Sequence, residues 1–191
     1  ADSFDQMIAN RLEPEIYSFR SLADFADAVS HAGENRYPIH LKLDTGMHRL
    51  GFMEEEIGRL CEVLPTMPAV KVASVFSHLN CADMPEEDAY TRAQIARYDR
   101  MSAAVAASLP YPVIRHTANS AAIERFPEAQ YDMCRLGLGL YGFGWRHNDA
   151  LRPVSTLRTR IVQIRRLAAG ETVGYGRAGR LTRPSVVATI P

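Results

Sequence analysis

Lysine is the residue that this sequence most nearly lacks. Its 191 residues include 22 basic side chains, of which only Lys42 and Lys71 are lysines and the rest are arginines. Any chemistry that needs a lysine amine is therefore restricted to those two positions. The 22 acidic residues bring the formal net charge to zero, which argues against nucleic acid or an anionic membrane as a partner.

Cysteine is scarce too, and no stretch is strongly apolar. Cys61, Cys81 and Cys134 are odd in number and have no CxxC or metal-ligand spacing, so neither a disulfide framework nor a bound metal is expected. A reducing, cytoplasmic setting is the simplest interpretation. No apolar run approaches a membrane span, and residues 1–5 lack the pattern of a secretory signal.

The first 140 residues or so alternate between β-like and amphipathic helical segments. Helices are expected from an N-cap at Ser21 to Gly33, across residues 57–64, and from Pro85 onward. Strands are predicted at residues 15–19, 39–44, 72–78, 113–117 and 133–141. Parallel strands need helical crossovers, so this order predicts a parallel sheet, either doubly wound or a (β/α) barrel.

Polar residues favour the barrel. They gather where the predicted strands end, which is where barrel enzymes place their chemistry. These residues are Lys42, Asp44, His78, Asn119 and Arg135.

The pattern changes after residue 146. Residues 154–167 are rich in Thr, Val and Ile, a turn follows at residues 169–171, and residues 186–190 look like a strand. We therefore predict a partial barrel over residues 1–146 and the start of a β-rich domain over residues 147–191.

Five short motifs, in order along the chain, carry a family resemblance. They are HLKLDTGMHRLGF at residues 40–52, Ser77-His78, HTANSAA at residues 116–122, RLGLGLYG at residues 135–142, and Gly174-Tyr175-Gly176. Together they resemble alanine racemases, enzymes of fold type III that depend on pyridoxal 5'-phosphate (PLP).

The resemblance implies an α/β fold, the second half of a (β/α)8 TIM-type barrel followed by the beginning of a mainly β C-terminal domain. It also implies a head-to-tail homodimer. The family's Lys-Ala-x-Ala-Tyr-Gly segment is not found, so the Schiff-base lysine that holds PLP is not present in this chain.

The resemblance also suggests catalytic roles. Racemisation needs a base on each face of Cα, and PLP as the electron sink. Tyr175 matches the tyrosine base that reaches across the dimer interface. Arg135 matches the arginine that faces the pyridine nitrogen and, because it does not deprotonate, keeps that nitrogen unprotonated. His78 is expected to stack near the pyridine ring or to hydrogen-bond toward Arg135.

Further positions lie in the longest motif. Arg49 resembles the arginine that binds the phenolic oxygen of the cofactor, and the backbone of Met47 corresponds to a position near the substrate carboxylate. Lys42 corresponds to a lysine that is carbamylated in many members and orients Arg49. The alternative for Lys42 is an ion pair, for example with Asp44.

The phosphate of PLP is expected at one end of the barrel. Backbone amides and a serine bind it in the family, which points to Ser120, Gly137 and Leu138, with Asn119 in support.

These resemblances predict interconversion of L- and D-alanine for peptidoglycan synthesis, with a serine or broad-specificity racemase left open. An alternative function, from a different class of protein, is a catalytically inactive, PLP-free half-barrel module. A PLP-binding barrel that does not racemise is a third possibility, against which the Gly174-Tyr175-Gly176 motif argues.

Overall fold

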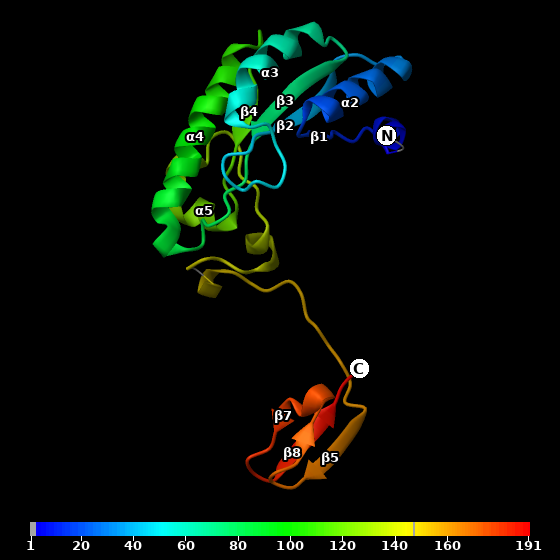
Figure 1. Ribbon diagram of the computed structural model, residues 1–191, viewed down its shortest axis with the longest axis vertical. Coiled ribbons are helices and arrows are strands. Elements are labelled where there is room, and N and C mark those ends of the chain that lie inside the picture. The colour runs from blue at the N-terminus through cyan, green and yellow to red at the C-terminus, as the bar shows by residue number, and fades with distance from the viewer. Residues whose placement is uncertain (1–2, 147) are drawn as a thin grey trace. The chain divides into compact units, whose positions relative to one another are not determined.

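The computed structural model describes residues 3–146 and 148–191 (Figure 1). The chain divides into two compact units, which we call the barrel unit (Ala1–Arg152) and the β unit (Pro153–Pro191). The division falls later than the boundary between residues 146 and 147 that the sequence suggested. Each unit is described by itself below.

The barrel unit is built on a four-stranded parallel sheet in the order β1-β2-β3-β4. The strands are β1 (Glu15–Ile16), β2 (Tyr37–Lys42), β3 (Val70–Phe76) and β4 (Ile114–His116). Its helices are α1 (Phe4–Ala9), α2 (Phe19–His31), α3 (Ile57–Val63), α4 (Asp88–Ala107) and α5 (Ser120–Arg125). Helices α2, α3 and α4 lie along the outer side of the sheet (Figure 1).

Short 3-10 turns occur in both units. They lie at Glu54–Glu56, Leu64–Thr66, Pro85–Glu87, Pro127–Ala129, Leu138–Tyr141, Asn148–Ala150 and Tyr175–Arg177. Among the described residues, no helix is both long and apolar enough to cross a membrane.

One hydrophobic core joins the sheet to its helices. Ile39 and Leu41 of β2 are fully buried against Leu22 and Phe25 of α2 and against Tyr98 of α4 in the same cluster. The period-two alternation predicted for β2 is present, because the intervening residues do not join this core. The opposite face of the sheet is thereby left for polar side chains.

A β-bulge in β3 determines which of its residues share that polar face. Ile39 pairs with Val72 and His40 pairs with Ser74, so Ala73 has no partner on β2. The extra residue reverses the alternation of β3 from Ser74 onward. Ser74 and Phe76 consequently lie on the same face as His40 and Lys42, whereas Val72 faces the helices.

The start of α2 differs from the expectation. Ser18, not Ser21, is the N-cap, and Ser21 completes a capping box: each serine hydroxyl accepts from the other's backbone N–H at 3.1 Å. Because the cap already occupies Ser18, the predicted strand at residues 15–19 is limited to Glu15–Ile16. The helix ends before Gly33, whose φ of +73° suits glycine.

The strand predicted at residues 133–141 is wrong. Leu138–Tyr141 form a 3-10 turn, preceded by Gly137 and closed by Gly142 in the left-handed region. The sheet therefore contains four strands among the described residues, where the sequence suggested about five. The period-two leucines at 136, 138 and 140 caused the error, and all three side chains are exposed.

The β unit contains only short strands and turns. Strand β5 (Gln163–Leu167) pairs antiparallel with β8 (Ser185–Thr189), and β6 (Thr172–Val173) pairs with β7 (Gly179–Arg180). The β-rich character predicted for this part is confirmed, although residues 154–162 form no strand.

Candidate active site

An aromatic ring on the polar face of the sheet has two cationic side chains over it. Phe76, at the end of β3, stacks on His116 of β4 with centroids 5.0 Å apart and planes at 6°. The Lys42 Nζ and the Arg135 guanidinium each lie 5.2 Å from the centroid of Phe76. The carboxyl ends of three neighbouring strands thus bring together residues that are far apart in the sequence.

Arg135 is the hub of this group. Its Nη1 donates to His116 Nδ1 at 2.5 Å, and its Nη2 donates to the Ser77 carbonyl at 2.6 Å and to His78 Nδ1 at 3.3 Å. Its backbone N–H donates to the Ala118 carbonyl at 3.0 Å, which fixes the segment that carries it. No described residue accepts a hydrogen bond from Arg135 Nε.

Both histidines around Arg135 are held neutral. Burial, followed by the positive charge of Arg135, lowers the pKa of His78 and of His116 to about 4. Since a guanidinium only donates, each Nδ1 that faces it has to be the unprotonated acceptor. Each ring consequently carries its proton on Nε2.

Lys42 is buried, with 5% of its surface exposed. Burial lowers its pKa, and the nearby charges of Arg135 and Arg49 act in the same direction. The ion pair with Asp44 is absent, because no carboxylate among the described residues lies within ion-pair distance of the amine. The predicted alternative for Lys42 is therefore wrong as far as Asp44 is concerned.

Asp44 instead organises the loop that follows β2. Its Oδ1 accepts from the backbone N–H of Gly46 at 2.9 Å and of His48 at 3.0 Å, and its Oδ2 lies 3.3 Å from His48 Nδ1. Burial alone raises the pKa of this carboxyl, but the two backbone hydrogen bonds and His48 bring it below its usual value. The loop is a local structure built around one ionised carboxylate.

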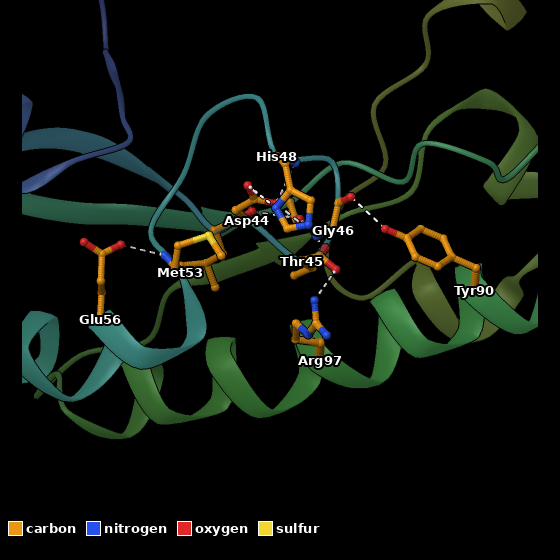
Figure 2. A network of polar contacts seen from close by, with 10 residues as sticks. Asp44, Thr45, Gly46, His48, Met53, Glu56, Tyr90 and Arg97 are labelled. Atoms are coloured by element: carbon orange, nitrogen blue, oxygen red, sulfur yellow. Dashed lines mark hydrogen bonds and ion pairs between the residues drawn. The ribbon is translucent and has the colours of Figure 1, made fainter.

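Two side chains of α4 tie the same loop to the helix (Figure 2). The Tyr90 hydroxyl donates to the Gly46 carbonyl at 2.7 Å, and Arg97 Nη1 donates to the Thr45 carbonyl at 3.2 Å. Gly46 has a φ of +141°, and a Cβ there would lie 2.5 Å from the Tyr90 oxygen. Glycine is therefore required at this position both for its backbone and for the close approach of Tyr90.

The same loop carries Met47 and Arg49. Met47 is half-buried and Arg49 is exposed. Arg49 nevertheless lies close enough to lower the pKa of both Lys42 and His78 through its charge. Lys42, Arg49 and His78 therefore share one electrostatic environment.

A cavity of about 390 Å³ opens beside Arg135. Ser120 Oγ accepts from two backbone N–H groups there, those of Gly137 at 3.0 Å and Gly139 at 3.1 Å. Asn119 caps α5 through the Ala122 N–H at 3.0 Å. The lining includes His78, Asn119, Ser120, Arg135, Gly137 and Leu138.

The alanine racemase N-terminal domain family matches residues 1–144, and the alanine racemase C-terminal domain family matches residues 154–191. The chain belongs to the alanine racemase family. These ranges cover both the group around Arg135 and the segment that holds Tyr175.

Individual relatives agree with this assignment. An alanine racemase of Sorangium cellulosum is 35% identical over all of this chain, which covers 50% of that protein. The solved alanine racemase of Streptomyces lavendulae matches 97% of this chain and 50% of its own, with a TM-score of 0.83 at 28% identity. An alanine racemase of Bartonella henselae, solved with covalently bound pyridoxal phosphate, has a TM-score of 0.72 at 26% identity, covering 98% of this chain and 51% of that one. The chain thus spans about half the length of the relatives it matches.

Tyr175, the residue matched to the racemase tyrosine, belongs to the β unit. It opens a 3-10 turn between Gly174, with a φ of +81°, and Gly176, with a φ of +64°. Its side chain is fully exposed and makes no described hydrogen bond through its hydroxyl. A tyrosine presented in this way is free to engage a neighbouring surface.

Sequence reasoning missed several residues that shape the site. In the sequence, Tyr90 and Arg97 cannot be told apart from other surface residues of an amphipathic helix. Their hydrogen bonds to the loop carbonyls are visible only in the structure. Ser74 and His40 were missed because the bulge at Ala73 hides their shared face. One signal in the sequence could have identified Ser74: it is a polar residue at a position where regular period-two alternation from Val72 would place an apolar one.

Proposed function

We propose that this chain contributes to a PLP-dependent alanine racemase, which interconverts L- and D-alanine for peptidoglycan synthesis. The observation that carries this proposal is Arg135, whose guanidinium is held by two neutral histidines beside a cavity with converging backbone N–H groups. Family membership over nearly the whole chain supports the same activity.

The residues fit the cofactor. Arg135 Nε is a donor without a described partner, suited to the lone pair of a pyridine nitrogen. In the same cavity, the N–H groups of Gly137 and Gly139 converge on Ser120 Oγ, and backbone N–H groups that converge in this way bind phosphate oxygens. Leu138 and Asn119 line the same space.

Bound PLP would supply the electron-withdrawing ring that makes the Cα proton of alanine removable. Arg135 would hold the ring nitrogen without protonating it, because its own proton is not released at neutral pH. We assign the base on one face of Cα to Tyr175 of a second copy, which makes the site a property of a homodimer. His78 would keep Arg135 in place.

The second base is the lysine that attaches the cofactor in the family. Lys42 is the only lysine in this group of residues, and we assign it a different role. Its burial and lowered pKa favour the neutral amine that reacts with carbon dioxide, and the resulting carbamate would orient Arg49 toward the cofactor. We therefore propose that the attaching lysine comes from outside these 191 residues.

We also propose a position for the substrate and a location in the cell. The backbone of Met47 would lie near the substrate carboxylate, next to Arg49. A cytoplasmic location is supported by the three cysteines, which are all unpaired.

The test has two arms. This chain is incubated with PLP, reduced with borohydride and weighed intact, and the full-length gene product is assayed on alanine, serine and lysine. We expect no stoichiometric adduct on this chain and fastest racemisation of alanine. A clean adduct on Lys42 or Lys71 would overturn the assignment of the cofactor site, and preference for serine or lysine would overturn the substrate.

A variant pair strengthens the second arm. Ser120→Ala removes the hydroxyl at the proposed phosphate site and should weaken PLP binding by about tenfold, the equivalent of one charge-assisted hydrogen bond. Ser102→Ala removes a buried hydroxyl that contacts Arg115 elsewhere and should leave PLP binding unchanged. A full-length product without activity or PLP binding would favour a PLP-free module.

A further inference from the structure

A row of five hydrogen-bonding side chains crosses the sheet, beginning at Arg135. From the guanidinium it passes through His116 on β4, Ser74 on β3 and His40 on β2, and it ends at Glu13. The links beyond Arg135 measure 3.0 Å from His116 Nε2 to Ser74 Oγ, 2.6 Å from Ser74 Oγ to His40 Nδ1, and 2.9 Å from His40 Nε2 to Glu13 Oε2.

We propose that Ser74 and His40 are positioning residues for Arg135: anchored on Glu13, they hold His116 so that its Nδ1 always accepts from the guanidinium. This leaves Arg135 Nε as the donor directed at the cofactor. The role toward the cofactor rests on the proposed function, whereas the hydrogen-bond row does not.

The direction of every bond in the row follows from its two ends. Arg135 can only donate, so His116 Nδ1 accepts and His116 Nε2 carries the proton that is donated to Ser74. At the far end a carboxylate oxygen of Glu13 accepts from His40 Nε2, and in a neutral His40 ring the other nitrogen, Nδ1, then accepts the Ser74 proton. Both ends impose the same direction, and every donor in the row has an acceptor.

The hydrogen bonds of this row are important because its central side chains are buried. Ser74 is 1% exposed and His116 is 4% exposed, so neither side chain has water available as a substitute partner. A hydroxyl can rotate to donate either way, and His40 removes that freedom at Ser74. Loss of the Ser74 hydroxyl would leave His116 Nε2–H buried without an acceptor, and the ring would be free to turn away from Arg135.

The stacking of His116 on Phe76 restrains the plane of the imidazole but not which edge of the ring faces the guanidinium. A half-turn of the ring about its Cβ–Cγ bond would keep the stacking but would place carbon Cδ2 toward Arg135 and carbon Cε1 toward Ser74, and neither carbon replaces the nitrogen in its hydrogen bond. The Ser74–His40–Glu13 row is therefore the element that selects one of two stacked orientations.

The experiment compares Ser74→Ala, Ser74→Thr and the control Ser102→Ala. Nitrogen-15 NMR of labelled histidines reports the protonated nitrogen of His116 in the protein without cofactor, and a titration gives the dissociation constant for PLP. In the unmodified protein we expect His116 protonated on Nε2. In Ser74→Ala we expect altered His116 signals and PLP binding weakened by about tenfold, or about 1.4 kcal/mol.

Ser74→Thr keeps the hydroxyl and should restore both readouts, and Ser102→Ala should change neither. A second variant, His40→Phe, keeps an aromatic ring but removes the Nδ1 acceptor, and it should shift both readouts in the same direction by less. Unchanged His116 signals in Ser74→Ala would overturn the row. Changed signals with unchanged PLP affinity would overturn the positioning role.

Failure of the proposed function gives a different result. If neither the unmodified chain nor the full-length gene product binds PLP, the proposed function and the positioning role both fail, while the NMR result still decides whether the row exists.

Discussion

Gly46 and Tyr90 give a sharp test of how the loop after β2 is held. An alanine at position 46 would place its Cβ 2.5 Å from the Tyr90 oxygen and 3.3 Å from Gln94 Cγ, at a φ of +141°. The backbone strain alone costs about 1–3 kcal/mol. Tyr90 is 39% exposed and can swing outward, at the loss of its hydrogen bond to the Gly46 carbonyl, which is worth about 0.5–1.5 kcal/mol.

Gly46→Ala should therefore destabilise the barrel unit by about 2–4 kcal/mol. Tyr90→Phe alone should cost about 0.5–1 kcal/mol, toward the lower end because the hydroxyl is partly exposed. In the Tyr90→Phe background the clashing oxygen and its hydrogen bond are already gone. Gly46→Ala should then cost about 1 kcal/mol less than in the unmodified protein, a coupling typical of residues in contact.

The measurement is urea unfolding followed by the fluorescence of Trp145, the single tryptophan, which lies in the barrel unit. Tyr17→Phe is the matched control, since Tyr17 is 40% exposed and its hydroxyl makes no described hydrogen bond; it should leave the midpoint unchanged. If the costs of Gly46→Ala and Tyr90→Phe add without coupling, the contact between them does not hold the loop.

Three further predictions concern pH and the core. The pKa of Asp44 lies below its usual value, so its contribution is present above about pH 4 and lost as the pH falls through the folded pKa; acid titrations of stability should be shallower for Asp44→Asn. His78 and His116 have pKa values of about 4 in the folded protein. Between about pH 6.5 and 4 the unfolded chain therefore binds more protons than the folded protein, and the free energy of unfolding decreases as the pH is lowered. His116→Gln should flatten that slope in urea titrations, and an equal slope would contradict the shift. Tyr98 is fully buried and donates to the Val75 carbonyl at 2.8 Å, so Tyr98→Phe should lower the free energy of unfolding by about 1–2 kcal/mol, and a change below about 0.3 kcal/mol would contradict that hydrogen bond.

Local patterns predicted the regular parts of the fold well. The alternation of Ile39 and Leu41 with His40 and Lys42 oriented β2, because a strand with one buried face has period two. The cap of α2 could not be assigned with the same certainty. Ser18 and Ser21 are both good capping residues, and the reciprocal bonds between them are decided by backbone geometry.

The segment around Gly137 shows a different limit. Its leucines alternate as in a strand, but a strand also needs a neighbour with which to pair, and none is present among the described residues. Glycines at 137, 139 and 142 allow the chain to turn instead. Periodicity records which residues are apolar and does not record whether a partner strand is available.

The sequence predicted some residues of the candidate site, and the contact between His78 and Arg135, but not most of the hydrogen bonds that connect them. Motif resemblance named Arg135, Ser120 and Lys42, and the structure places Arg135 and Ser120 around one cavity, with Lys42 close by over the Phe76 ring. The link from Arg135 through His116 to Ser74 depends on strand register and on a bulge, which are long-range features. The contacts of His116 and Ser74 therefore could not be inferred from spacing.

The unpaired Ala73 in β3 has a consequence for how this protein can change. Because Ala73 pairs with no residue of β2, a deletion of Ala73 would leave Val72 opposite Ile39 and Ser74 opposite His40, in a ladder without the bulge. Ser74 and Phe76 would keep the face that they share with His40 and Lys42. A deletion of Ser74 would instead bring Ala73 opposite His40 and remove the hydroxyl from that face. At this point in the gene, the identity of the residue that pairs with His40 is therefore constrained more tightly than the presence of the bulged residue.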